Sequence, residues 1–83
     1  MRRLPRVDDP LPTFAANLRR IREERGLSQE ALALRADMDP AEVRRIEAGK
    51  RDPGVRILTR LAAGLDTVPA ELLAGIAATA SKD

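Results

Sequence analysis

The sequence predicts an all-α fold in which five short helices share one core. Apolar residues recur with helical spacing in five separate segments, and the connections between these segments contain only a few residues. No stretch alternates between apolar and polar residues clearly enough to require a β-strand. A chain of 83 residues is long enough for one domain with a modest core.

The N-terminal residues 1–12 differ from the rest of the chain in composition. They contain three prolines and three arginines without an apolar period, so we expect them to form a flexible arm. The helical domain is expected over residues 13–78. Residues 79–83 are expected to form a frayed C-terminus.

A first helix is predicted over residues 13–25. Thr13 is a candidate for its N-cap, and Gly26 is placed to end it. One face of this helix is apolar, because three large residues are spaced by four and then three positions: Phe14, Leu18 and Ile21. We expect this face to be buried in the core.

Each of the next two predicted helices has its own start signal. Ser28 is the expected N-cap of a helix over residues 29–36, and Asp39 is the expected N-cap of a helix over residues 40–48. Glu42 stands three residues after Asp39, where its carboxylate can bond back to the cap.

The connection between these two helices is too tight to be an ordinary loop. Pro40 suits the first position of the helix over residues 40–48, since no N–H donor is needed there. Gly49 ends that helix. Both helices turn an apolar face to a shared core, formed by Leu32, Ala33, Ala36, Met38, Val43 and Ile46. This is the layout of a helix-turn-helix, whose second helix can enter a DNA major groove.

Two more helices are predicted after the turn that residues 49–54 form. The first, over residues 55–65, carries an apolar face of Ile57, Leu58, Leu61, Ala62 and Leu65. The second, over residues 69–78, is expected to bury Leu72, Leu73 and Ile76. The same terminal helix offers small residues beside Leu73 and Ile76, so we expect these two to form the seam of a homodimer.

Composition excludes several classes of chemistry. The chain has no cysteine and no histidine, which excludes disulfides, Cys/His zinc sites, thiol nucleophiles and histidine acid–base catalysis. We therefore expect no enzyme activity, no metal and no cofactor. Phe14 is the only aromatic residue, which argues against modules that stack bases on aromatic rings. No apolar run approaches the length of a membrane span, and we expect a cytoplasmic protein.

The residues LRRIREERGLSQEALA at 18–33, VRRIEAGKRDP at 43–53 and ELL at 71–73 resemble the lambda-repressor-like helix-turn-helix family, also called the Xre or Cro/repressor family. The resemblance implies a compact five-helix lambda-repressor-like domain that binds double-stranded DNA, usually to regulate transcription. Two positions depart from the family pattern. Asp37 stands where the family usually has glycine, although aspartate tolerates the left-handed conformation. Val68 stands where a capping serine is preferred.

The resemblance also implies roles for individual residues. Base contacts are expected from the third helix, at Arg45, Arg44, Ala41 and Glu42, with Glu42 either a cap or an acceptor from a cytosine amino group. Phosphate contacts are expected from Gln29, Lys50 and Arg51. Arg22 and Glu47 match a pair that forms a partly buried salt bridge in relatives and fixes the angle of the third helix.

The partners that we expect are double-stranded DNA, a second copy of the chain, and the transcription machinery or a cognate protein. The basic arm formed by Arg2, Arg3 and Arg6 either enters a minor groove or is an idle terminus. The alternative function is a protein-interaction module or antitoxin-type partner that keeps the fold with weak or no DNA readout. The net charge of only +2 and the lack of hydrogen-bonding groups on Pro40 and Ala41 favour this alternative.

Overall fold

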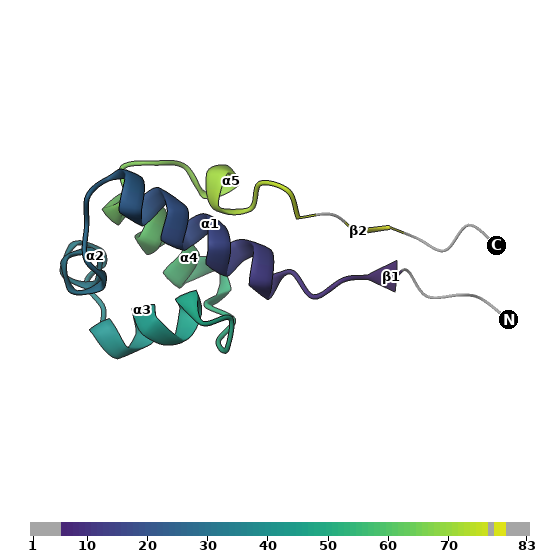
Figure 1. Cartoon of the computed structure of the whole chain (residues 1–83), viewed down its shortest axis with the longest axis horizontal. Coiled ribbons are helices and arrows are strands. Elements are labelled where there is room, and N and C mark those ends of the chain that lie inside the picture. The colour runs from purple at the N-terminus through teal and green to yellow at the C-terminus, as the bar shows by residue number, and fades with distance from the viewer. Residues whose placement is uncertain (1–5, 77, 80–83) are drawn as a thin grey trace, which may run out of the picture.

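Five α-helices pack together in the computed structural model, which describes residues 6–76 and 78–79 (Figure 1). They are α1 (Leu11–Glu24), α2 (Gln29–Ala36), α3 (Pro40–Glu47), α4 (Gly54–Gly64) and α5 (Pro69–Leu72). The expected all-α class is therefore confirmed. None of these helices is both long and apolar enough to cross a membrane.

Two short strands join the ends of the described chain. In β1 (Arg6–Val7) and β2 (Ala78–Thr79), Arg6 lies opposite Thr79 and Val7 opposite Ala78 in an antiparallel pair. The pair projects away from the helices (Figure 1). The sequence did not predict these strands, because two residues are too few to show an alternating pattern. The rest of the expected arm and C-terminus, residues 1–5 and 80–83, lies outside the described residues.

The first helix begins two residues earlier than predicted. The N-cap is Pro10 and not Thr13, and the carboxylate of Asp9, one residue earlier, accepts a hydrogen bond from the backbone N–H of Leu11 at 3.0 Å. Pro10 and Pro12 fit at this helix start, because the first turn needs no internal N–H donors.

The two caps of the helix-turn-helix are confirmed. The hydroxyl of Ser28 accepts from the N–H of Ala31 at 3.0 Å, and the carboxylate of Asp39 accepts from the N–H of Ala41 at 2.8 Å. Between the two helices, Asp37 adopts the left-handed conformation with φ of 55°, as the resemblance implies for this position. The chain therefore turns sharply from α2 into α3.

The last helix is much shorter than predicted. It ends at Leu72, and Gly75 has a left-handed φ of 81°. The side-chain amide of Asn17 in α1 donates to the carbonyl oxygens of Leu72 at 3.0 Å and Ala74 at 2.8 Å. These bonds satisfy the carbonyl of Leu72, which the helix itself leaves unpaired, and that of Ala74 just after the helix. Val68, at the N-cap, provides no side-chain hydrogen bond to the helix start.

The core lies between α1, α2, α3 and α4, with α5 closing one side. Its buried apolar residues are Phe14, Leu18, Ile21, Leu32, Ala33, Ala36, Val43, Ile46, Leu61, Ala62, Leu65 and Leu72. Leu73 was expected to be buried but is exposed, because the chain has left the helix at this point. Gly64 allows α4 to approach α2, since a Cβ there would lie 3.3 Å from the backbone nitrogen of Ala36.

Two arginines, Arg25 directly after α1 and Arg35 in α2, bind the C-terminal end of α4. Nε of Arg25 donates to the carbonyl of Leu65 at 2.8 Å, and Nε of Arg35 donates to the carbonyl of Gly64 at 2.7 Å. The last carbonyls of a helix have no partner within the helix and carry partial negative charge, which favours cations. Part of the arginine content therefore serves the fold.

Candidate nucleic-acid interface

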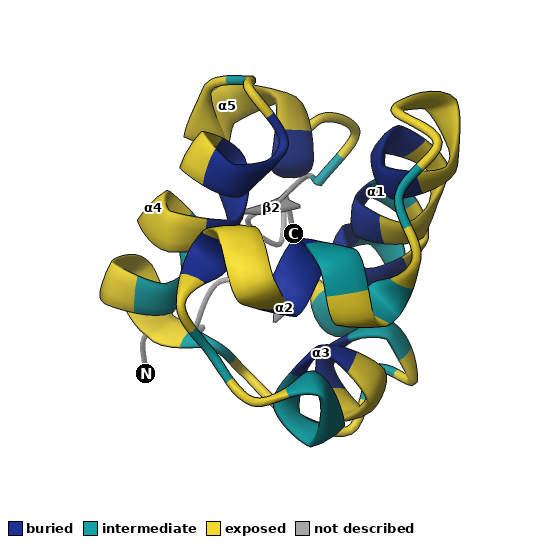
Figure 2. Ribbon diagram, turned by 90° about the vertical axis from the view of Figure 1, so that its left-hand side faces the viewer, coloured by how far each residue is buried: buried dark blue, intermediate teal, exposed yellow. Residues whose placement is uncertain are grey.

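One side of α3 is anchored in the core and the other side faces solvent. Val43 and Ile46 are buried completely or nearly so, while Arg44 and Arg45 between them are exposed. Figure 2 shows the helix at the lower edge of the molecule, with its buried residues toward the other helices. The spacing of apolar and charged residues in this short helix therefore produces an exposed basic face.

The C-terminal end of α3 is fixed by a buried ion pair. Nε and Nη2 of Arg22 in α1 donate to the two carboxylate oxygens of Glu47, at 2.6 and 3.0 Å. Nη1 of Arg22 donates to the carbonyl of Leu27 at 2.8 Å. The two charged side chains are only 10% and 3% exposed. The pair that the resemblance implies is thus present and joins the end of α1 to the last residue of α3.

This environment raises the pKa of the Arg22 guanidinium. The hydrogen bond to the Glu47 carboxylate is the largest cause and outweighs the opposing effect of burial. Arg22 therefore stays charged throughout the ordinary pH range. Its stabilising effect is present at every pH below the unfolded pKa of arginine and is lost only as the pH rises through the still higher folded value.

Gln29, an expected phosphate ligand, belongs to the same network. Its side-chain nitrogen donates to Oε1 of Glu47 at 3.1 Å. An amide nitrogen carries two hydrogens, so this bond leaves one donor for a phosphate. Glu47 is the last residue of α3, and through this bond it also positions Gln29, the first residue of α2.

Glu42 does not form the capping box that the spacing allowed. Its Oε1 accepts from Nη1 of Arg45 at 2.9 Å, and its Oε2 lies 2.6 Å from Nε of Arg51. We call Glu42, Arg45 and Arg51 the Glu42 clamp. One carboxylate thus holds two cations that were expected to contact DNA, one on α3 and one in the loop that follows it.

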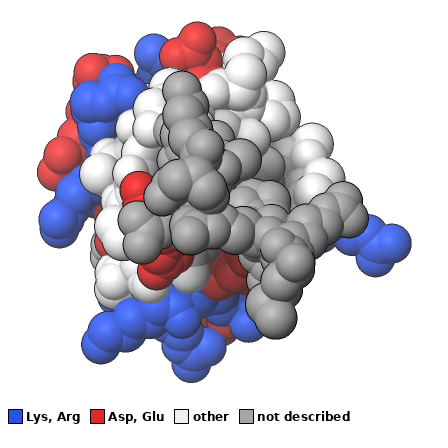
Figure 3. Space-filling view, turned by 90° about the vertical axis from the view of Figure 1, so that its right-hand side faces the viewer, with Lys and Arg blue, Asp and Glu red and all other residues white. Residues whose placement is uncertain are grey.

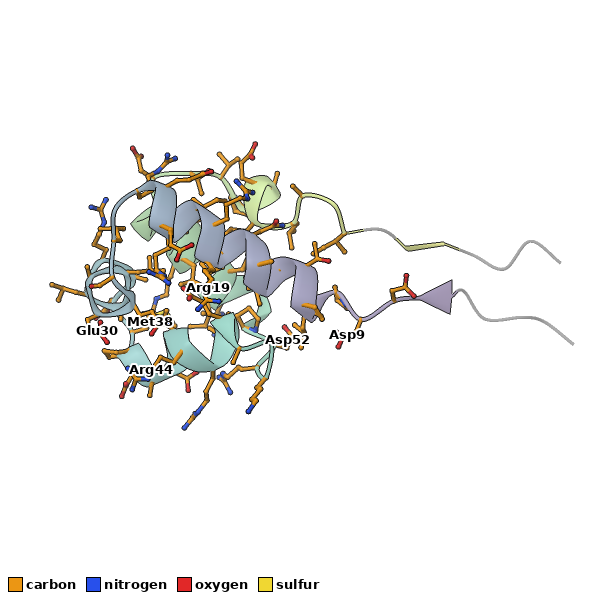
Figure 4. All side chains as sticks on the ribbon, viewed as in Figure 1. Asp9, Arg19, Glu30, Met38, Arg44 and Asp52 are labelled. Carbon is orange, nitrogen blue, oxygen red and sulfur yellow. The ribbon has the colours of Figure 1, made fainter. Side chains whose placement is uncertain are left out.

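The remaining charged residues of this face are held less closely. Nη1 of Arg44 lies 3.5 Å from a carboxylate oxygen of Glu30 in α2, and both side chains are largely exposed. In Figure 4, Arg44 lies on the outer side of α3 and Glu30 lies above it on α2. Lys50 is exposed beyond the end of α3, and Ala41 is partly buried in its first turn.

Basic side chains gather along the lower edge of the molecule (Figure 3), the edge that α3 forms in Figure 1, with acidic side chains beside them. No group of three His, Cys, Asp or Glu residues within 6–76 and 78–79 is arranged to hold a metal ion. The exposed face of α3 offers guanidinium donors, which suit guanine edges and phosphates.

Sequence reasoning missed the local partners of these cations. Glu30 lies near Arg44, and Arg51 lies near Glu42, but the members of each pair come from different elements. Their spacing in the sequence therefore does not predict the contacts. Arg45 and Glu42 are three residues apart in one helix, so this pair was accessible to a pattern argument.

Known proteins resemble this chain in both sequence and structure. The family model HTH_3, described as helix-turn-helix, matches residues 18–73. The restriction-modification controller protein C.AhdI from Aeromonas hydrophila is 39% identical, with a TM-score of 0.73 over 75% of this chain and 94% of that chain. The controller protein C.Esp1396I is 27% identical, with a TM-score of 0.71 over 76% of this chain and 85% of that chain.

A longer protein shares the fold. An HTH_3 family transcriptional regulator from Vibrio cholerae is 29% identical, with a TM-score of 0.76 over 81% of this chain and 39% of that chain. The similarity thus covers a minor part of the Vibrio protein. Among curated protein sequences, none matches this chain.

Proposed function

We propose, since this chain belongs to the HTH_3 helix-turn-helix family, that it regulates transcription by inserting α3 into the major groove of double-stranded DNA. The family and its relatives make the chain a DNA-binding transcriptional regulator. The observation that carries the finer proposal is the position of α3, whose exposed face is basic while its other face is buried. The similarity to C.AhdI, which covers 94% of that chain, supports a regulator of the controller kind.

The proposed contacts divide into base readers and phosphate ligands. Arg45 and Arg44 donate to guanine edges, Ala41 contacts the groove without hydrogen bonds, and Glu42 accepts from a cytosine amino group. Phosphates are bound by Gln29 at the start of α2, and by Lys50 and Arg51 after α3. The ion pair between Arg22 and Glu47 supports this assignment because it fixes the angle of α3 relative to the rest of the domain.

Binding to duplex DNA is expected to depend steeply on salt. Roughly four to six phosphate contacts per subunit predict a slope of about −4 to −5 when log affinity is plotted against log salt concentration. A fluorescence anisotropy titration of a labelled duplex at several salt concentrations measures this slope. A slope near zero would contradict the proposal, since groove binding without release of counterions is not expected for an arginine-based interface.

We further propose that the regulator is a homodimer, because helix-turn-helix dimers read half-sites one helical turn apart. Leu73 and Ile76 line an apolar pocket of about 180 Å³ together with Phe14, Val55 and Leu58. Leu73 and Val55 are both exposed. This pocket, close to α5, supports the seam that the sequence predicts at Leu73 and Ile76.

The substitution Leu73→Glu is expected to convert the dimer to a monomer, because it places two charges in one apolar seam. Sedimentation velocity measures the change. Leu34→Glu is a matched control, since Leu34 is 83% exposed on α2 whereas Leu73 is 42% exposed. Monomers from Leu34→Glu with dimers from Leu73→Glu would place the seam on α2 instead.

A further inference from the structure

The proposed DNA-binding face contains a negatively charged side chain, Glu42, among its arginines. Both oxygens of Glu42 are occupied by guanidinium groups, at 2.9 Å from Arg45 and 2.6 Å from Arg51. The contact to Arg45 has the distance of a charge-assisted hydrogen bond, and the contact to Arg51 is a short ion pair. A DNA phosphate also binds guanidinium nitrogens, so Glu42 competes for one nitrogen of each arginine that a phosphate or a guanine edge could use.

Other acidic residues of the exposed surface do not share this arrangement. The ion pairs of Glu24, Glu30 and Asp37 have distances of 3.4, 3.5 and 3.7 Å. The side chain of Glu42 is 27% exposed, whereas that of Glu30 near Arg44 is 66% exposed. Partial burial and two short contacts make the clamp a stronger competitor than an ordinary surface pair.

We infer that the Glu42 clamp is a specificity device, which withholds Arg45 and Arg51 from DNA of arbitrary sequence. The inference rests on the proposed groove binding by α3. A duplex whose phosphates bind the donors that face Glu42 must displace the carboxylate from them. A non-cognate duplex must then leave Glu42 without a hydrogen-bond donor inside a negatively charged groove, which is unfavourable.

A cognate duplex compensates for this displacement. Arg45 has five N–H donors and uses one on Glu42, so it can bind a guanine while remaining near the carboxylate. Glu42 lies one helical turn before Arg45 on α3, and a cytosine amino group next to that guanine provides its new donor. The clamp therefore favours half-sites in which a cytosine is adjacent to the guanine that Arg45 reads.

The test compares Glu42→Gln with the wild type on two duplexes. One is a random-sequence duplex, and the other is selected from a random pool by the wild-type protein. Affinity for the random duplex is expected to rise about tenfold, with a salt slope steeper by about 2, because two arginines are released for phosphate. Affinity for the selected duplex is expected to change less, so the ratio between the two falls.

Glu30→Gln is the matched control, since it removes one negative charge from the same face beside Arg44. It is expected to change both affinities by less than about threefold, as for a screened surface charge. Equal gains from Glu30→Gln and Glu42→Gln would overturn the inference, because net charge alone would then account for them. Weaker binding of Glu42→Gln to both duplexes would overturn it as well.

The failure of the inference differs from the failure of groove binding. A wild type that binds neither duplex defeats the proposed function and the clamp together. A wild type that binds the selected duplex with a steep salt slope, while Glu42→Gln keeps the same ratio between the duplexes, defeats only the clamp. Circular dichroism melting of both variants confirms that each comparison is made on folded protein.

Discussion

Replacement of Glu47 by alanine is expected to destabilise the fold by about 3 to 5 kcal/mol, as is typical when one partner of a buried ion pair is removed. Arg22, whose side chain is 10% exposed in the native structure, would lose two hydrogen bonds, and Gln29 would lose its acceptor. The free energy of unfolding of a small domain is about 5 to 15 kcal/mol, so the loss is a large part of it. Urea unfolding followed by circular dichroism measures the change.

The matched control is Glu24→Ala, which removes the exposed partner of Arg20 at 3.4 Å in α1. An exposed pair of this kind contributes about 0 to 1 kcal/mol, so the control is expected to remain close to the wild type. If Glu47→Ala unfolded at the same urea concentration as Glu24→Ala, the ion pair would not hold α3, and the fixed angle proposed for this helix would have no support.

The double substitution Arg44→Ala and Arg45→Ala is expected to lower duplex affinity by at least about 30-fold, because each good arginine–guanine pair contributes about 1 to 3 kcal/mol. Both side chains are exposed, and neither contributes to the buried core. The fold is therefore expected to persist. Fluorescence anisotropy with a labelled duplex measures the affinity, and thermal melting measures the stability.

A second double variant, Arg20→Ala with Arg60→Ala, removes the same charge from exposed positions on α1 and α4. It is expected to weaken binding only slightly, since the long-range effect of net charge is screened by salt. Unchanged binding of the α3 variant would mean that this helix does not read DNA. The protein-interaction module would then become the better account of the exposed face.

The sequence by itself determined the helix-turn-helix, because the signals that define it are local. Ser28 and Asp39 bond to N–H groups two or three residues away. Asp37 sets the turn through its own backbone conformation. Helical spacing also identified Val43 and Ile46 as the buried side of α3. Interactions over one helical turn depend little on the rest of the chain, so a pattern in the sequence is enough to predict them.

Tertiary structure alone decided where α5 ends and what the cations of the interface contact. Asn17 bonds to carbonyls 55 and 57 residues away, and Arg51 reaches Glu42 from the loop after α3. Such contacts form only when packing of the core brings distant segments together. A polar side chain with several donors can satisfy many different partners, and packing selects which of them lies within reach. The exposed face of α3 follows from local spacing, whereas the carboxylate held against its arginines follows from the folded arrangement of helix and loop.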